Sequence, residues 1–202
     1  MPIAAANPPQ AQSVHLLAAQ GFPPIANDQA RVLILGSMPG IASLRAVQYY
    51  AHPRNQFWPI MASILGIDLV ALAYPQKHQA LLDAGIALWD VLQSCHRPGS
   101  LDADIAPDSI VVNDFATFFQ QHPAIRQIYF NGAAAEQHFK RRVEPLLTFR
   151  QALRQTPRPP SSLSFQRLPS TSPAHTLDFP EKLTAWRAIA KILGQTGDLK
   201  QD

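Results

Sequence analysis

The sequence contains very little cysteine: one residue, Cys95, in a chain of 202. A single cysteine excludes a disulfide framework within the chain and excludes thiolate metal clusters, which need several cysteine ligands. The seven histidines form no HExxH motif and no paired spacing, so we expect no metal site. No apolar run approaches the roughly 18 residues of a membrane span, and the N-terminus lacks the pattern of a signal peptide. We therefore expect a soluble, cytoplasmic protein.

Charge is sparse and slightly positive. Charged residues make up 15% of the chain, the formal net charge is +3 and the pI is about 9.2. This balance permits a nucleic acid as a partner without requiring one. The length of 202 residues suits one well-buried domain. We assign that domain to residues 21–202 and interpret residues 1–20 as a flexible tail.

Strand-like and helix-like segments alternate along the chain. The run RVLILGS is continuously apolar over most of its length, which is typical of a strand buried on both faces of a parallel sheet. The alternation predicts an α/β fold, a three-layer α/β/α sandwich with a central parallel sheet of about four strands. Asn113 is the expected N-cap of the second helix. The expected strands are 31–37, 85–92, 125–132 and 165–173, the expected helices are 57–66, 111–123, 133–147 and 180–194, and 154–162 is expected to be a loop.

The unusual segments gather at one edge of this predicted sheet. In an open α/β sheet, ligands bind outside the carboxyl ends of the strands. GSMPG (36–40) and YYAHPRN (49–55) follow the first strand, Asp90 lies near the end of the second, and STSPAHT (170–176) follows the fourth. GSMPG lacks the Gly-Lys-Ser/Thr of a P-loop, the GxGxxG of a dinucleotide site and the GxSxG of a nucleophile elbow. We therefore expect any reaction at this site to depend on amides, backbone dipoles and bound water.

Two halves of one motif carry a family resemblance. GSMPG (36–40) followed by YAHPRNQFW (50–58) resembles the first motif region of the uracil-DNA glycosylase superfamily, and within it is most similar to the hypoxanthine-DNA (deoxyinosine) glycosylases. STSPAH (170–175) resembles the second motif, a loop that enters the DNA. The resemblance implies an enzyme, without a cofactor, that hydrolyses the N-glycosidic bond of a deaminated base flipped out of DNA. No lysine lies within the motifs to form a Schiff base, so we expect the enzyme to be monofunctional. Hypoxanthine is the expected base, with uracil as a second substrate.

The resemblance also implies roles for single residues. Tyr50 corresponds to the aromatic that stacks on the flipped base, with a plain core tyrosine as the alternative. Met38 stands where mismatch-specific relatives carry a water-positioning Asn, and Asn55 is the catalytic match in the hypoxanthine branch. Its amide would orient the attacking water rather than abstract a proton; the alternative is an N-cap for a helix that opens at Gln56.

Asp90 falls where the uracil enzymes keep a base-reading Asn. Hypoxanthine offers N1–H as a donor and O6 as an acceptor, so an ionised Asp90 could accept from N1–H and a protonated one could donate to O6. A solvent-facing carboxylate at the strand end is the alternative. Backbone groups of the glycine-rich turn would contact the base edge, since glycine lets the main chain approach closely. The expected base-binding residues are Gly36, Ser37, Met38, Tyr50, Asp90 and Ser170.

Contacts to DNA are expected on both sides of that site, through side chains and backbone N–H groups that position phosphates without reading sequence. The expected DNA-binding residues are Ser43, His52, Arg54, Ser172, Pro173, Ala174 and His175. We interpret three further features as structural: Lys140, Arg141 and Arg142 as a solvated helix end, Asn131–Gly132 as the cap of the following helix, and Cys95 as a thiol without a catalytic role.

The expected partner is double-stranded or single-stranded DNA carrying a deaminated base, bound by a monomer, with no membrane contact. Three alternatives remain open: a uracil or mismatch glycosylase, a catalytically silent nucleic-acid-binding module of the same fold, and a hydrolase of free nucleotides or nucleosides. Salt-sensitive binding to duplex DNA separates a DNA enzyme from the last of these.

Overall fold

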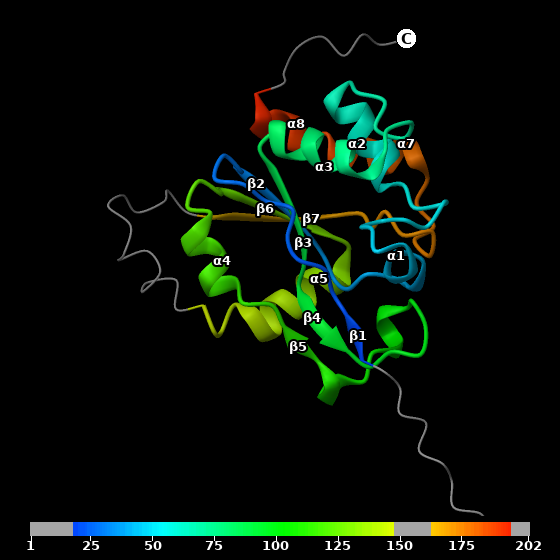
Figure 1. Ribbon diagram of the computed structural model, residues 1–202, viewed down its shortest axis with the longest axis vertical. Helices are drawn as coiled ribbons and strands as arrows, with labels where there is room; N and C mark the ends of the chain where they lie inside the picture. The colour runs from blue at the N-terminus through cyan, green and yellow to red at the C-terminus, as the bar shows by residue number, and fades with distance from the viewer. Residues whose placement is uncertain (1–17, 148–162, 195–202) are drawn as a thin grey trace, which may run out of the picture.

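A computed structural model of the protein describes residues 18–147 and 163–194. Its centre is a sheet of four parallel strands in the order β3-β2-β6-β7 (Figure 1). The predicted parallel sheet and its number of strands are confirmed. Residues 1–17 of the predicted tail and the loop predicted at 154–162 lie outside the described residues. The four strands are β2 (Val32–Gly36), β3 (Ile86–Asp90), β6 (Gln127–Asn131) and β7 (Ser164–Leu168).

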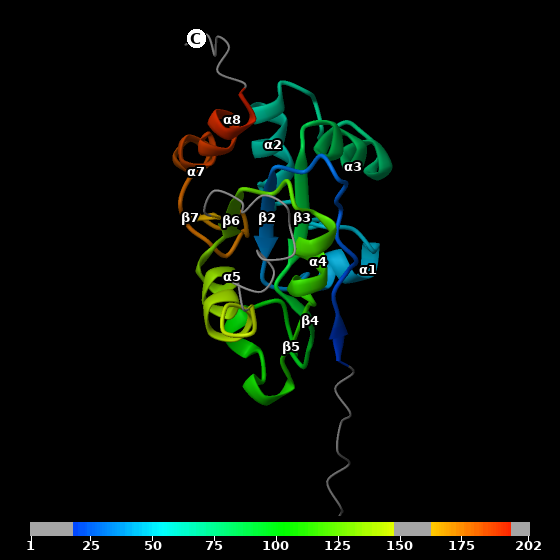
Figure 2. The ribbon, with the colours of Figure 1, turned by 90° about the vertical axis from the view of Figure 1, so that its left-hand side faces the viewer.

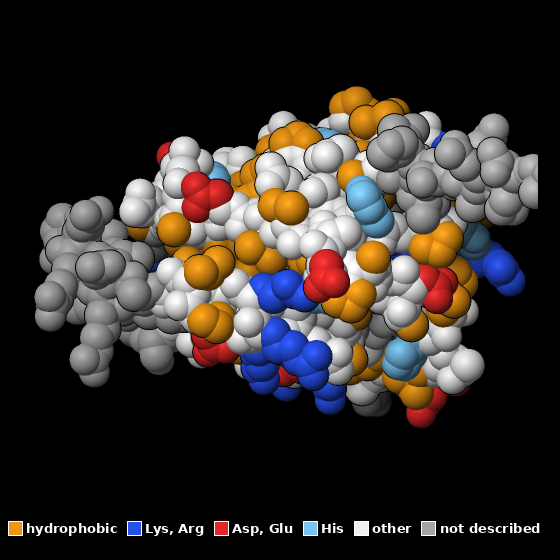
Figure 3. Space-filling view, turned by 90° about the horizontal axis from the view of Figure 1, so that it is seen from below, with side chains coloured by type: hydrophobic (Ala, Val, Ile, Leu, Met, Phe, Trp, Pro, Cys, Tyr) orange, Lys and Arg blue, Asp and Glu red, His pale blue; other side chains and the backbone are white. Residues whose placement is uncertain are grey.

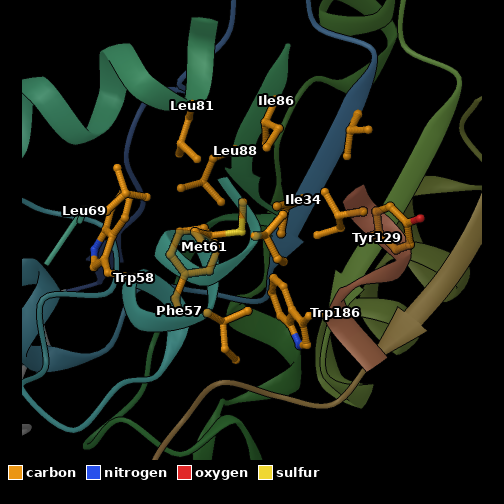
Figure 4. Close-up of a cluster of buried hydrophobic side chains, with 14 of the residues drawn as sticks. Ile34, Phe57, Trp58, Met61, Leu69, Leu81, Ile86, Leu88, Tyr129 and Trp186 are labelled. Carbon is orange, nitrogen blue, oxygen red and sulfur yellow. The ribbon is translucent and has the colours of Figure 1, made fainter. Parts of the chain in front are cut away.

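Both faces of the sheet are covered, because alternate residues of the central strand β2 enter separate apolar clusters. Val32 and Ile34 belong to the cluster of Figure 4, while Leu33 and Leu35 belong to the cluster on the opposite face. The predicted three-layer sandwich is thereby confirmed, with one group of helices above the sheet and one below it in Figure 1. The upper group is α2 (Phe57–Leu65), α3 (Tyr74–Asp83), α7 (Phe179–Trp186) and α8 (Ala188–Leu193), and the lower group is α4 (Phe115–Gln121), α5 (Ala133–His138) and the π-helical turn η3 (Phe139–Val143).

Short polar side chains set the start of two helices. Asp114 accepts the backbone N–H of Thr117 at 3.1 Å to cap α4, and Asp178 caps α7 in the same way at 2.9 Å. The prediction that Asn113 caps α4 is wrong. Its side chain instead donates to the backbone carbonyl of Asp90 at 2.8 Å. That bond ties the segment before α4 to the end of β3, next to the carboxyl edge of the sheet.

Other helix boundaries also differ from the expected ones. The helix expected at 180–194 is divided at Arg187 into α7 and α8. The one expected at 133–147 changes from α-helix to π-helix at Phe139. Two helices were not predicted: α3, and the short α1 (Ile41–Ala46) that follows the GSMPG turn.

A second, small sheet was not predicted either. Antiparallel pairing joins β1 (Ala19–Gln20), β4 (Leu92–Cys95) and β5 (Val111–Val112), and the three strands lie together below the main sheet in Figure 2. Since Ala19 pairs with Cys95, the last residues assigned to the flexible tail belong to the folded part. Among the described residues no helix is long and apolar enough to cross a membrane.

Candidate active site

A pocket of about 160 Å³ opens at the carboxyl end of the main sheet. Its walls are the ends of β2, β3 and β6, the segment that carries Ser100 and Asp102, and two loops, which we call the first loop (residues 37–55) and the second loop (residues 169–175). Arg54, Ala174 and His175 lie outside the lining. The predicted site residues that line the pocket are Gly36, Ser37, Met38, Ser43, Tyr50, His52, Asn55, Asp90, Ser170, Ser172 and Pro173. The sheet edge therefore brings most of the predicted residues together.

Asp90 ends β3 inside this pocket and is only 3% exposed. The alternative of a solvent-facing carboxylate is therefore wrong. A Cβ on Gly36 would overlap Asp90 Oδ1, so only glycine at the end of β2 leaves room for the carboxyl group. Burial, reinforced by the nearby charge of Asp102 and opposed by Arg97, raises the pKa of Asp90 to about 7. Asp90 Oδ2 has no hydrogen-bond partner among the described residues.

The two tyrosines of the first loop have different environments. Tyr49 is a core residue: it is buried, and its hydroxyl donates to the backbone carbonyl of Pro23 at 3.1 Å. Tyr50 turns the other way, with a left-handed φ of 54°, and its ring stacks on Phe57 with centroids 4.0 Å apart. Its hydroxyl is buried near Asn131, and burial raises its pKa above the ordinary value. Trp58 fixes the backbone at Tyr49, since its indole N–H donates to the Tyr49 carbonyl at 3.1 Å.

Asn55 lies at the pocket wall just before α2. The side-chain Oδ1 of Asn55 accepts the backbone N–H of Phe57 at 3.0 Å, and the backbone N–H of Asn55 donates to the His52 carbonyl at 2.8 Å. The helix begins one residue later than the capping alternative assumed, with Gln56 as its N-cap, and Asn55 instead holds the residue before the helix in a turn. Asn55 Nδ2 makes no hydrogen bond within the described part of the chain. The same amide can therefore hold the start of α2 and still offer a donor to the pocket.

A cluster that the sequence did not suggest holds the turn of the first loop. The Arg97 guanidinium donates to the Pro39 carbonyl at 2.6 Å and pairs with Asp102 at 3.4 Å. Asp102 Oδ2 accepts the Ser37 hydroxyl at 2.8 Å, and the hydroxyl of Ser100 accepts the first N–H of α1 at 2.9 Å. The Arg97 side chain is 1% exposed, so its charge depends on these partners rather than on solvent. No local sequence motif identifies the cluster, because its members contact residues some 60 positions away in the sequence.

The second loop is attached to β6 by Asn131. Its Oδ1 accepts the Thr171 backbone N–H at 2.8 Å, while its Nδ2 donates to the Thr171 hydroxyl at 2.9 Å. The prediction that Asn131–Gly132 caps the following helix is right for Gly132, the N-cap of α5, and wrong for Asn131, because no side chain caps that helix. Gly132 has a φ of 97°, and a Cβ there would lie 2.9 Å from Ser170 Cβ. Asn131 also lines the pocket, so it is a site residue that sequence reasoning missed.

Two side chains of α7 hold the ends of the same loop. The Trp186 indole N–H donates to the Pro169 carbonyl at 2.9 Å. Lys182 is 1% exposed, and its ammonium group donates to the His175 carbonyl at 3.0 Å. Burial lowers the pKa of Lys182 below the ordinary value. The loop between these two points is therefore fixed at both ends by buried donors.

The residues expected to grip DNA differ in exposure. Ser43 is buried and its hydroxyl accepts the Ala51 N–H at 3.1 Å, whereas Arg54 is exposed at the tip of the first loop. Pro173, Ala174 and His175 are exposed on the second loop. In the face seen in Figure 3, Lys and Arg side chains gather in one part and do not form a continuous basic surface. Their roles in binding DNA stay predictions.

Two of the three features interpreted as structural, the basic run at 140–142 and Cys95, keep that interpretation. Lys140 and Arg141 are exposed, and Lys140 pairs with Glu136 at 2.8 Å, as expected of a solvated helix end. Cys95 is buried in the apolar cluster around α4 and lies outside the pocket lining. Within residues 18–147 and 163–194, no three His, Cys, Asp or Glu side chains are grouped so that they could hold a metal ion.

Comparison with known proteins agrees with this geometry. The sequence model of the uracil DNA glycosylase superfamily matches residues 23–192, which spans both loops and all four strands of the main sheet. The chain belongs to the uracil DNA glycosylase superfamily. Its resemblance to that family, and the uracil-DNA-glycosylase-like fold expected from it, are confirmed.

Relatives of this superfamily member include two named proteins. The hypoxanthine DNA glycosylases of Methanosarcina barkeri and of Methanosarcina acetivorans are each 38% identical to it over 128 residues, which is 63% of this chain and 77% of theirs. The solution NMR structure of a candidate uracil DNA glycosylase from Methanosarcina acetivorans superimposes with a TM-score of 0.70 at 31% identity, covering 88% of this chain and 99% of that one. The protein is therefore a monofunctional DNA glycosylase, and its partner is DNA.

Proposed function

We propose that this DNA glycosylase releases hypoxanthine from deoxyinosine in DNA. The observation that carries the proposal is the convergence of three groups on one cavity: the Asn55 amide, the Tyr50 ring and the Asp90 carboxyl group. The names of the two Methanosarcina relatives support hypoxanthine as the base. Uracil is the second candidate, because uracil presents the same pairing of a ring N–H with an adjacent carbonyl oxygen, and because the superfamily carries its name.

The catalytic group in this proposal is the Asn55 amide. An amide oxygen has two lone pairs, so Oδ1 can accept from an attacking water while it also accepts the Phe57 N–H. Its Nδ2 is available to donate to the sugar or to a phosphate oxygen. Met38 lines the same pocket but has only a weak thioether acceptor, so it cannot replace the amide. Asn55 therefore works by orienting water and by electrostatics rather than as a general base.

The flipped base is placed against Tyr50 in this proposal. Its stack on Phe57 holds the tyrosine ring rigid from behind, which leaves the opposite face for the base. Stacking a base on an aromatic side chain is worth roughly 1–3 kcal/mol, which offsets much of the few kcal/mol that extrusion from the duplex costs. Backbone groups of Ser37 and Met38, both in the pocket wall, would contact the base edge.

The DNA itself is proposed to be a duplex bound by one copy of the protein. The exposed Pro173 and Ala174 at the tip of the second loop would enter the minor groove in place of the flipped nucleotide. Arg54 and His175, exposed on either loop, would contact phosphates on both sides. Single-stranded DNA is the weaker substrate in this scheme, since it offers no groove for the wedge.

The test is single-turnover release of the base from duplexes that carry one hypoxanthine, uracil or xanthine. Asn55→Ala should lower release of hypoxanthine by at least about 100-fold while DNA binding persists. Asn55→Ser is the matched variant, because a serine hydroxyl can accept the Phe57 N–H but is too short to reach into the pocket. It should keep the melting temperature of the wild type and still lose activity.

Other outcomes would change the proposal. Full activity in Asn55→Ser would reduce Asn55 to a capping residue and remove the catalytic assignment. Release of uracil without release of hypoxanthine would favour the second candidate. Intact binding without release of any of the three bases would favour a catalytically silent module.

A further inference from the structure

The pocket contains two buried polar atoms that the protein leaves without partners. Within the described residues, five buried side-chain nitrogen or oxygen atoms lack a hydrogen bond, and two of them, Tyr50 Oη and Asp90 Oδ2, belong to pocket-lining residues. Buried polar atoms are almost always paired in folded proteins, so an exception at a cavity marks the place of a ligand group. The two groups lie on the same side of Gly36, since a Cβ on that glycine would overlap Asp90 Oδ1 and would meet Tyr50 Oη at 3.1 Å.

Burial of Asp90 favours its neutral form. Tyr49, Tyr50 and Tyr74, which interact with Asp90, are buried or half-buried and keep their protons, because burial raises the pKa of each, so they add no charge beside the carboxyl group. The anionic Asp102 in the η1 turn (Asp102–Asp104) adds to the effect of burial. Arg97 is the cation that lowers the pKa of Asp90, and its guanidinium group already bonds to the Pro39 carbonyl and to Asp102. His52 also lines the pocket.

We propose that Asp90 acts as a neutral carboxylic acid whose O–H donates a hydrogen bond to the carbonyl oxygen at position 6 of the flipped purine. This inference rests on the proposed function, because it names how the same pocket chooses its base. A carboxyl group kept neutral by an apolar site is an effective donor. Hypoxanthine has an oxygen at position 6, whereas adenine has an amino group there. A donor at this place therefore pairs with the deaminated purine and opposes a donor on the normal one.

The same hydrogen bond would assist the reaction. When the bond between C1′ and N9 breaks, its electron pair moves onto the purine and part of the negative charge reaches the oxygen at position 6. A donor aimed at that oxygen binds the leaving base more strongly in the transition state than in the ground state. Asp90 keeps its proton throughout this step. Once ionised, it would repel the same oxygen and activity would fall.

The first experiment measures single-turnover release between about pH 6 and pH 9, with hypoxanthine or uracil in the same duplex. Above about pH 7, the wild-type rate should fall about tenfold for each further pH unit, because the neutral fraction of Asp90 falls in that proportion. Asp90→Asn keeps a donor at every pH, so its profile should lose this alkaline decline. Asp90→Leu should lose at least about 100-fold throughout. Asp104→Asn, at an exposed carboxylate nearby, is the control and should match the wild type.

A second readout does not depend on activity. From pH 3.8, the ordinary pKa of the group, up to about pH 7, the unfolded chain loses the Asp90 proton while the folded chain retains it. Wild-type stability should therefore fall with rising pH across that window, and Asp90→Asn should not share the loss. The melting temperature of Asp90→Asn should exceed that of the wild type by a margin that grows up to about pH 7 and then levels off.

The outcomes separate this inference from the proposed function. A flat or rising wild-type profile with hypoxanthine, or a melting-temperature margin that does not change with pH, would overturn the Asp90 role and leave the hypoxanthine activity intact. Release of uracil alone would end the proposed function, and an alkaline decline that Asp90→Asn abolishes would then keep the donor role for the uracil carbonyl. Silence on both bases at every pH would overturn both.

Discussion

The two loops that frame the pocket are held in different ways. The turn of the first loop is held by a charged cluster that is distant in the sequence. Arg97 bonds to Pro39, 58 residues away, and Asp102 bonds to Ser37, 65 residues away. The second loop is held by Asn131, Trp186 and Lys182, at sequence separations of 40, 17 and 7. Of these three side chains only the lysine is ionisable. The turn of the first loop thus depends on ion pairing, and the side that carries the proposed wedge depends mainly on neutral donors.

This difference teaches where each loop is vulnerable. Removing one member of a buried ion pair leaves the other without compensation, so the first loop should respond sharply to a single substitution. The second loop has several independent attachments, including the Gln56 N–H that donates to the Thr171 carbonyl at 3.0 Å. Losing one of them should shift the loop without releasing it.

The largest effect is expected for Arg97→Met. The substitution leaves the Pro39 carbonyl and the Asp102 carboxylate without their donor. We expect a loss of about 3 kcal/mol in the free energy of unfolding, or roughly 6–12 °C in melting temperature, at the low end for buried pairs because Asp102 is partly exposed. Arg187→Met, at an exposed arginine, is the matched control and should stay near the wild type. Equal melting temperatures for the two variants would show that the cluster does not hold the first loop.

A smaller effect is expected for Gly132→Ala, at the base of the second loop. An alanine there is strained by the φ of 97°, and its Cβ would press on Ser170 Cβ. The cost should be about 1–3 kcal/mol in the free energy of unfolding, measured by denaturant titration. Gly99→Ala meets nothing closer than 3.8 Å and has no such backbone constraint, so it should cost little. The reverse order of the two variants would contradict the structural account of this loop.

The smallest effect is expected for Lys182→Met. Methionine fills the space of the buried lysine but cannot donate to the His175 carbonyl, so the end of the second loop loses one attachment. DNA affinity should fall by about 3- to 10-fold, a free-energy change typical of one hydrogen bond, with little loss of thermal stability because a buried ammonium group is itself costly. Lys191→Met, at an exposed lysine of α8, removes the same charge. Equal losses in the two variants would mean that total charge, and not loop position, sets the affinity.

The strands of the main sheet could be predicted because their pattern is local. Val32 to Leu35 form an unbroken apolar run, and burial on both faces of a parallel sheet produces that run directly. The small antiparallel sheet could not be predicted, since Ala19–Gln20 and Val111–Val112 are too short for any periodicity. The helix α3, Tyr74–Asp83, begins with a mostly polar run and buries only Leu81, so no apolar stripe predicts it.

The candidate site divides in the same manner. Asn55, Tyr50 and Asp90 could be placed because each sits in or beside a motif at the carboxyl end of a strand. Arg97 and Asp102 could not, because their contacts with the turn are set by tertiary packing and leave no spacing to read. Asn131 was placed correctly at a strand end, but its side chain bonds to Thr171 across the sheet instead of to the helix that follows it in sequence.

The bond from Trp58 to the Tyr49 carbonyl has a counterpart on the other side of the pocket, in the bond from Trp186 to the Pro169 carbonyl. The chain has three tryptophans, and the third, Trp89, donates to the Phe22 carbonyl and not to either loop. Each loop is thus bonded to one tryptophan, an intrinsic fluorophore whose emission depends on the polarity and hydrogen bonding around the indole. Replacing Trp89 and one of the other two by phenylalanine would leave a single emitter on one loop. The protein would then report optically, without any attached dye, which side of the pocket moves first when DNA arrives.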